Sequence, residues 1–323
     1  MLECGMDRIG EIAAFGTAIC WTLSAIFFER ATRRISVLAV NLFKLLFAMA
    51  FLTLSAWIVR GLPFPTDASG RAWLFLSLSG LIGFVITDIF LFTAYKTIGS
   101  RMSTLFLALS PPVTALLGFL FLGEAMGPRA LLGMLLVVAG IIIAVLARGK
   151  LQIAGRKVQV PVPSHPGDQH PASRPVLMSK EDKRGYLFAF LSTIGQSIGM
   201  ILTKHGLQDY HPIAGSNIRI MAGIVGFLVV GFFWDRGKSY RSALKDRAGL
   251  KFTFFGAIAG PFLGVTLSLF AMQKTMAGVV STLIGLTPIL IIPPSILLFK
   301  QKVKAAEIGG ALLAVAGTAV FFL

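Results

Sequence analysis

The segment GMLLVVAG, from Gly133 to Gly140, returns 177 residues later as GALLAVAG, from Gly310 to Gly317. Pro288 follows Pro111 at the same spacing. A second block returns at one fixed offset: Leu91-Phe92, Lys96-Thr97 and Ser103-Thr104-Leu105 match Leu269-Phe270, Lys274-Thr275 and Ser281-Thr282-Leu283. Apolar segments match by chance more often than mixed ones, so the shared Lys-Thr, Ser-Thr and Pro positions carry most weight. The sequence therefore predicts one module present twice.

The amino-acid composition indicates that this module lies in a lipid bilayer. The chain is 55% hydrophobic and 14% charged, with a mean hydropathy of +0.81, whereas about 25% of the residues of a soluble domain are charged. A helix needs roughly 20 apolar residues to cross the hydrocarbon core of a bilayer. Ten runs qualify: 12–28, 35–59, 73–94, 102–122, 130–147, 186–203, 213–234, 252–273, 279–299 and 305–323. We expect an all-α membrane protein with ten transmembrane helices.

Five spans in each copy place the second copy on the opposite side of the membrane from the first. The halves are thus predicted to be two inverted five-helix repeats, at 1–147 and 185–323. Inverted repeats are a recurring plan of secondary transporters, with the substrate site near the membrane midplane between them. Residues 148–184 contain five prolines among polar residues and are predicted to form a flexible tether.

The distribution of Lys and Arg predicts the orientation. The connections after the odd-numbered helices hold 22 of these residues, and the other side holds six. The positive-inside rule places the side with 22 charges, including the tether, in the cytoplasm and both termini outside. We therefore expect a multi-pass protein of the cell (inner) membrane. The net charge of +16 is better explained by this topology and by lipid headgroups than by nucleic acid.

Prolines interrupt the fourth helix of each half. Ser110-Pro111 lies near the middle of the run 102–122, and Thr287-Pro288 lies in the run 279–299. Each proline removes a backbone donor and frees carbonyls that a buried substrate could use. Matched hydroxyl and proline pairs in both halves favour positions that line the pathway. The alternative is a kink that shapes packing, with each hydroxyl bonded to its own helix.

At these residues the chain resembles a known family. The segment SPPVTALLGFLFLGE, from Ser110 to Glu124, followed by Gly133 and Gly140, is similar to the motif of EamA-type transporters of the drug/metabolite transporter superfamily. The resemblance covers essentially the whole chain. It implies a secondary carrier, often an exporter, of small metabolites or amphipathic solutes. Gln301 replaces Glu124 in the second copy, so any role of that acid belongs to the first half.

Ionisable residues within spans are costly and by default suggest function. Lys44 and Asp88 are predicted to lie roughly 13 and 9 Å from the cytoplasmic ends of their helices, at a rise of about 1.5 Å per residue. An ion pair between them is possible, and Asn41, three residues before Lys44, shares its face. The alternative is that Lys44 snorkels to the headgroups. Arg219 aligns with Lys44 at an offset of 175 and is predicted to be a structural anchor.

Helices 1 and 6 open the two halves and border the central cavity in the family that the chain resembles. Trp21 and Ser24 lie on helix 1, and Gln196 aligns with Trp21 at the offset of 175. Trp21 is too far from the interface to anchor a headgroup, so it either packs or forms an apolar wall for substrate. Gln196 is expected to face another helix or a wet cavity, because an unpartnered buried amide is unfavourable.

The remaining observations limit the function. No phosphate-binding loop for ATP is present, no cofactor or metal site is predicted, and no catalytic Ser-His-Asp grouping is apparent. The expected partners are a small-molecule substrate and the bilayer, with protons as one candidate coupling ion through Asp88 or Glu124. The alternatives are a channel, a membrane scaffold that binds a partner through 148–184, and an intramembrane lipid-processing enzyme.

Overall fold

The computed structural model describes residues 2–122, 127–155, 180–207, 210–274, 283–299 and 303–322. Within these ranges the chain is helical and contains no strand. Glu124, Gln301 and residues 156–179 of the predicted tether lie outside the described residues. Residues 148–155 and 180–184, which were predicted as the ends of the tether, belong to the helices Pro128–Gly155 and Lys180–Leu207. Six helical stretches are long and apolar enough to cross a membrane, and three shorter apolar helices accompany them. The chain is therefore an all-helical, multi-pass membrane protein, while the count of ten spans stays a prediction.

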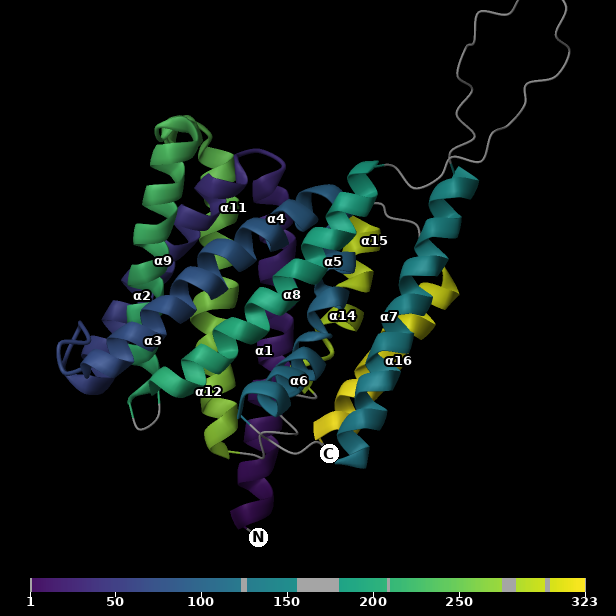
Figure 1. Cartoon of the computed structure of the whole chain (residues 1–323), viewed down its shortest axis with the longest axis horizontal. Coiled ribbons are helices and arrows are strands. Elements are labelled where there is room, and N and C mark those ends of the chain that lie inside the picture. Colours follow the sequence, from purple (N-terminus) through teal and green to yellow (C-terminus); the bar gives the residue numbers. More distant parts are fainter. Residues whose placement is uncertain are drawn as a thin grey trace, which may run out of the picture.

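The first half consists of helices in the order that the apolar runs predict (Figure 1). They are α1 (Leu2–Thr32), α2 (Val37–Arg60), α3 (Gly70–Gly80), η1 (Leu81–Ile86), α4 (Thr87–Ile98), α5 (Ser100–Leu107), α6 (Ser110–Leu122) and α7 (Pro128–Gly155). Helices α3, η1 and α4 form one continuous apolar stretch, Gly70–Ile98.

The second half repeats this order. Its helices are α8 (Lys180–Leu207), α9 (Pro212–Asp235), α10 (Lys238–Lys245), α11 (Arg247–Ala257), η2 (Ile258–Gly264), α12 (Val265–Lys274), α14 (Thr287–Leu290), α15 (Ile292–Phe299) and α16 (Ala305–Phe322). The π-helical segments η1 and η2 begin 177 residues apart, at the offset of the sequence repeat. The two copies thus share a backbone irregularity as well as a motif.

Local signals explain where several helices begin and end. Ser36 caps α2 by accepting a hydrogen bond from Ala39 N, and Ser69 caps α3 in the same way through Ala72 N, both at 3.2 Å. Such caps satisfy backbone donors that have no partner within the helix. Gly61 ends α2 with a φ of 70°, a left-handed conformation that glycine adopts without strain.

Each half packs its first helix on the third helix of the other half. Helix α1 lies along α11, η2 and α12, and α8 lies along α3, η1 and α4. A serine hydroxyl forms a hydrogen bond between the halves at each contact. Ser24 Oγ donates to Gly256 O over 2.9 Å, and Ser79 Oγ donates to Gly199 O over 2.7 Å. The arrangement is reciprocal, as expected for two copies related by an approximate two-fold axis.

The repeated glycine motif forms the contact between α7 and α16, which lie side by side at the edge of the molecule (Figure 1). A Cβ atom on Gly140 would lie 2.5 Å from Gly310 O, and one on Gly317 would lie 2.8 Å from Gly133 O. These pairs run in opposite directions along the two helices, so α7 and α16 are antiparallel. Only glycine permits backbones to approach this closely.

Candidate functional site

The centre of the candidate site is a buried ion pair between α2 and α4. Lys44 and Asp88 are only 5% and 7% exposed, and Lys44 Nζ donates to Asp88 Oδ2. The Lys44 ammonium also lies 4.7 Å from the centroid of the Phe92 ring, a favourable cation–π distance. The pair predicted from the sequence is therefore present, and Lys44 does not snorkel to the surface.

Two further polar side chains approach Asp88. Asn41 Nδ2 donates to Val37 O over 3.1 Å and lies 3.5 Å from Asp88 O, while its Oδ1 is buried with no hydrogen-bond partner among the described residues. Arg219 reaches over from α9: its Cζ lies 4.9 Å from the Phe84 ring centroid, and it is close enough to act electrostatically on Asp88.

This charge cluster, defined as Lys44, Asp88 and Arg219, joins both halves. A Cβ atom on Gly83 would lie 3.3 Å from a terminal nitrogen of Arg219, so the guanidinium lies against the π-helical segment η1. The position of Arg219 is thus interior, whereas the sequence suggested an anchor near the end of its helix. Lys44 and Arg219 align at the offset of 175, but only Lys44 forms an ion pair with Asp88 among the described residues. The cluster has a net charge of +1 when all three groups are ionised.

At the first proline break, hydroxyls from α8 bond to backbone carbonyls. Ser197 Oγ donates to Ser110 O over 3.2 Å and lies 3.4 Å from Ser110 Oγ, and Thr193 Oγ1 donates to Phe106 O over 3.0 Å. The side chain of Pro111 is outside the described part. Ser110 therefore lies at a contact between the halves, where carbonyls beside the break already have partners.

The second break differs from the first. Thr287 Oγ1 donates to Ile284 O over 2.7 Å, so its hydroxyl bonds to its own turn. Pro288 is buried and borders a cavity of about 10 Å³, which is room for about one water molecule. Pro111 and Pro288 both stand in the first turn of a helix, α6 and α14, while the hydroxyls of Ser110 and Thr287 have different partners. That these positions line the pathway stays a prediction.

Trp21 and Ser24 share one contact between α1 and the second half, whereas Gln196 lies apart from them on α8. Trp21 is half-buried and packs on η2, because Cβ atoms on Gly260 and Gly264 would lie 3.2 and 3.3 Å from its ring. Ser24 is buried in the same contact through its bond to Gly256 O. Gln196 is exposed on α8 and makes no hydrogen bond to a described residue. The role of all three in binding substrate stays a prediction.

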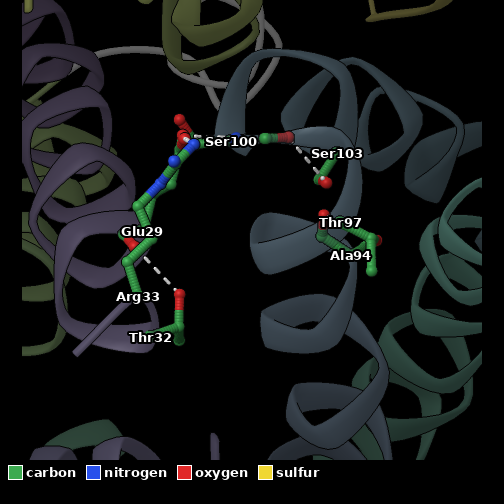
Figure 2. A network of polar contacts seen from close by, with 8 residues as sticks. Glu29, Thr32, Arg33, Ala94, Thr97, Ser100 and Ser103 are labelled. Atoms are coloured by element: carbon green, nitrogen blue, oxygen red, sulfur yellow. Dashed lines mark hydrogen bonds and ion pairs between the residues drawn. The ribbon is translucent and has the colours of Figure 1, made fainter. Parts of the chain in front are cut away.

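A second set of buried charges was missed by the sequence analysis. Arg101 in α5 pairs with Glu307 in α16, with 2.9 Å between NH2 and Oε2 and exposures of 5% and 4%. Glu29 in α1, which is fully buried, accepts a hydrogen bond from Ser100 N over 2.7 Å and pairs with Arg33 over 2.8 Å. Figure 2 shows the Glu29 side chain directed from α1 toward Ser100 at the start of α5. These contacts tie α1, α5 and α16 together at the end of the molecule where α1 ends.

The sequence did not predict that these three charges are buried. Each of them, Glu29, Arg101 and Glu307, lies within a few residues of the end of an apolar run. Charges at such positions are usually solvated, and Arg101 is one of the 22 Lys and Arg residues that were assigned to the connections. The signal that distinguishes Glu29 is its position directly before the Arg30 to Arg34 cluster, on a helix that continues to Thr32. No group of three or more His, Cys, Asp or Glu side chains comes together within the described ranges.

A loop contact joins the two halves at the opposite end of the molecule. Tyr210 OH donates to Asp67 Oδ1 over 2.9 Å, and Arg60 pairs with Asp67 in the same loop region. Desolvation by neighbouring atoms raises the pKa of the exposed Asp67 carboxyl, but the hydrogen bond from Tyr210 and the charge of Arg60 outweigh this effect and hold the pKa below its usual value. Asp67 is therefore ionised near neutral pH and bonded across the halves.

Comparisons with known proteins agree with this architecture. A family model described as the EamA-like transporter family matches the chain twice, at residues 8–146 and 183–323. No curated protein matches the chain. Among solved structures, a crystal structure described only as that of a protein aligns with 16% identity and a TM-score of 0.60, over 96% of this chain and 95% of the other. At this identity the likeness concerns the fold alone.

Proposed function

The chain belongs to the EamA-like transporter family of the drug/metabolite transporter superfamily, and we propose that it is a secondary active exporter of small metabolites or amphipathic solutes. The observation that carries this proposal is the reciprocal packing of two matched modules, α1 on the third helix of the second half and α8 on that of the first. Two such modules can rock against each other about a site between them, which is the basis of alternating access.

The proposed substrate site includes the charge cluster with Asn41, because these polar groups are buried between the halves. Asn41 Oδ1 and Arg219 Nε have no hydrogen-bond partner among the described residues, and an unpartnered buried polar atom is costly. A substrate with a polar or zwitterionic group would supply the missing partners. Ser110, Pro111, Thr287 and Pro288 are proposed to line the same pathway at the two breaks, with Trp21, Ser24 and Gln196 contributing from the first helix of each half.

The buried pairs at the end of α1 are proposed to keep the pathway closed at that end. For the pathway to open at that end, α5 must move relative to α1 and α16, and the pairs Arg101–Glu307 and Glu29–Ser100 must separate. Their rupture costs free energy that substrate binding or a driving ion has to offset. Protons are proposed as the coupling ion, with Asp88 as the acceptor, since burial disfavours the ionised form of a carboxyl group and Asp88 is 7% exposed. The neighbouring cations act in the opposite sense, so proton uptake requires Asp88 to separate from Lys44.

Flux through purified protein in liposomes tests the proposal. A carrier shows saturable uptake of labelled amino acids, nucleosides or cationic drugs that depends on an imposed pH gradient, because each turnover requires a conformational cycle. A channel instead shows flux that rises linearly with substrate concentration. Flux without saturation, or none with any substrate class, would contradict the carrier and favour the channel or the scaffold.

Asp88→Asn provides the internal control for coupling. It removes the acceptor while keeping the size of the side chain, so the pH dependence of transport is expected to disappear. Exchange of labelled for unlabelled substrate is expected to persist. An unchanged pH dependence in this variant would place coupling at another residue and leave the carrier function intact.

A further inference from the structure

An apolar groove runs between α1 and α15, with a volume of about 380 Å³. Its walls include Leu23, Ile26 and Phe27 of α1 and Pro293, Pro294 and Leu297 of α15. The α1 residues recur at helical spacing on one face, so the groove follows the helix axis. It is open along its side, since Leu23 and Leu297 are 43% and 77% exposed. In a bilayer this opening meets lipid acyl chains.

One cation, the side chain of Arg30, lies at one end of the groove. Arg30 lies in the last turn of α1 and is the single charged residue among the groove walls. Its Cζ lies 5.8 and 5.7 Å from the ring centroids of Phe252 and Phe299. Arg33 lies beside it, with Cζ 5.4 Å from the same Phe299 ring. Aromatic rings hold the guanidinium groups in place without neutralising their charge.

The charges around Arg30 favour an anionic ligand. Arg33 is paired with Glu29, and Arg34 with Asp246. For Arg30, the described part of the chain provides ring contacts but no ion pair. A cation at the end of a transmembrane helix lies at the depth of the lipid headgroups. Basic pockets between transmembrane helices at this depth suit lipid phosphate groups.

We propose that this groove binds one acyl chain of an anionic phospholipid, with the lipid phosphate held by Arg30 and with Arg33 alongside. The apolar walls favour a chain over a soluble anion, because a small hydrated anion would leave Leu23, Phe27 and Leu297 without a partner. The cation selects an anionic over a zwitterionic lipid through its unneutralised charge. The site is separate from the charge cluster and does not depend on what the protein transports.

Native mass spectrometry of the full chain in neutral detergent tests this site. The probes are phosphatidylglycerol and phosphatidylcholine with identical acyl chains, and sodium phosphate alone. We expect one phosphatidylglycerol to remain bound under conditions that remove phosphatidylcholine, and to raise the apparent melting temperature. Sodium phosphate alone is expected to produce no shift.

Three variants localise the effect. Arg30→Gln is expected to weaken phosphatidylglycerol binding about five-fold, as for the loss of one basic residue at an anionic surface, with little change for phosphatidylcholine. Leu23→Trp fills the groove and is expected to weaken both lipids. Arg247→Gln removes an exposed cation that is not among the walls of this groove and is expected to bind both lipids as the wild type does.

Three outcomes would overturn the proposal. They are equal binding of the two lipids by the wild type, an Arg30→Gln variant that keeps the wild-type preference, and competition by free phosphate, which would indicate a soluble-anion site. The melting temperature of each variant without lipid is measured as well. A variant that has simply lost its fold is thereby recognised, and the comparison of Arg30→Gln with Arg247→Gln still decides the question.

Discussion

At the scale of single residues, the charge cluster predicts an order of stabilities. Lys44→Ala leaves Asp88 with Arg219 nearby, whereas Asp88→Ala leaves the buried Lys44 and the half-buried Arg219 with no carboxylate to offset their charge. Breaking a buried pair costs roughly 3 to 5 kcal/mol, and we expect Asp88→Ala to be the more destabilising change. The double variant Lys44→Asp with Asp88→Lys is expected to recover part of the loss. Thermal unfolding in detergent measures the order, and equal melting temperatures for all variants would contradict it.

Trp21→Ala and Gln196→Ala are predicted to behave differently. Trp21 packs on η2, so its removal leaves a void and is expected to lower stability by up to about 3 kcal/mol as well as flux. Gln196 is exposed, so Gln196→Ala is expected to keep the wild-type melting temperature and to reduce flux alone. Initial rates per amount of folded protein separate the two effects. A Gln196→Ala variant with wild-type transport kinetics would remove Gln196 from the site.

Single residues also show what the sequence can predict of a buried site. Lys44 and Asp88 were found because each interrupts an apolar run at a similar depth, where an isolated charge is unfavourable. Arg101 and Glu307 were not found, because a charge near the end of a run is normally solvated. They are buried because α5 and α16 both pack against α7 and α14. The partners of Ser110 and Thr287 depend on side-chain rotation and on the neighbouring helix, which sequence spacing does not determine.

At the scale of elements, two adjacent glycines in α16 form a matched pair of test sites. A Cβ atom on Gly310 would lie 2.5 Å from Gly140 O and 2.7 Å from Ala144 N, whereas one on Gly309 would have nothing within 4 Å. Gly310→Ala is expected to separate α7 from α16 and to lower the melting temperature. Gly309→Ala is expected to be neutral, or stabilising by up to about 1 kcal/mol, since alanine favours the helix. Equal effects of the two substitutions would contradict the close contact.

The sequence predicted the positions of the helices and of their breaks, but not their π-helical segments. Apolar run lengths located the helices, and Pro111 and Pro288 located the breaks that precede α6 and α14. The π-helical segments η1 and η2 were not predicted, because a widened turn has no sequence pattern of its own: η2 contains Pro261 and η1 contains no proline. The glycine motif was recognised as a repeat, but the sequence did not show that its two copies contact each other.

At the scale of the whole molecule, the orientation can be tested by cysteine labelling. The background carries Cys4→Ala and Cys20→Ala. Thr66→Cys, between α2 and α3, and Ser242→Cys, in α10, then provide two exposed thiols. From the Lys and Arg distribution, an impermeant reagent added to intact cells is expected to label the first and spare the second. Both are expected to react after the cells are opened, and the reverse pattern in intact cells would overturn the orientation.

Cutting the chain between Pro161 and Pro175 tests whether the two halves hold together without the connection. The packing of α1 on α11 and α12, of α8 on α3 and α4, and of α7 on α16 is expected to keep the halves associated. Co-purification of an untagged second half with a tagged first half measures this. The same cut in a Gly310→Ala chain is the control and is expected to reduce co-purification. Halves that separate in the otherwise unchanged protein would contradict the two-module architecture.

The contact between α7 and α16 has a consequence for ancestry. Gly133 meets Gly317 and Gly140 meets Gly310, so one motif recognises its own copy in the opposite direction, as the two faces of a homodimer do. Separate five-helix subunits could form this contact only if they inserted into the membrane in both orientations. A strong Lys and Arg bias in the loops of a subunit would select one orientation and prevent this. Fusion into one gene removes that conflict, because each copy can then evolve its own loop charges. Fusion also allows each copy to change independently, and Asp88, with Thr266 at the matching position, is one position where the two copies differ.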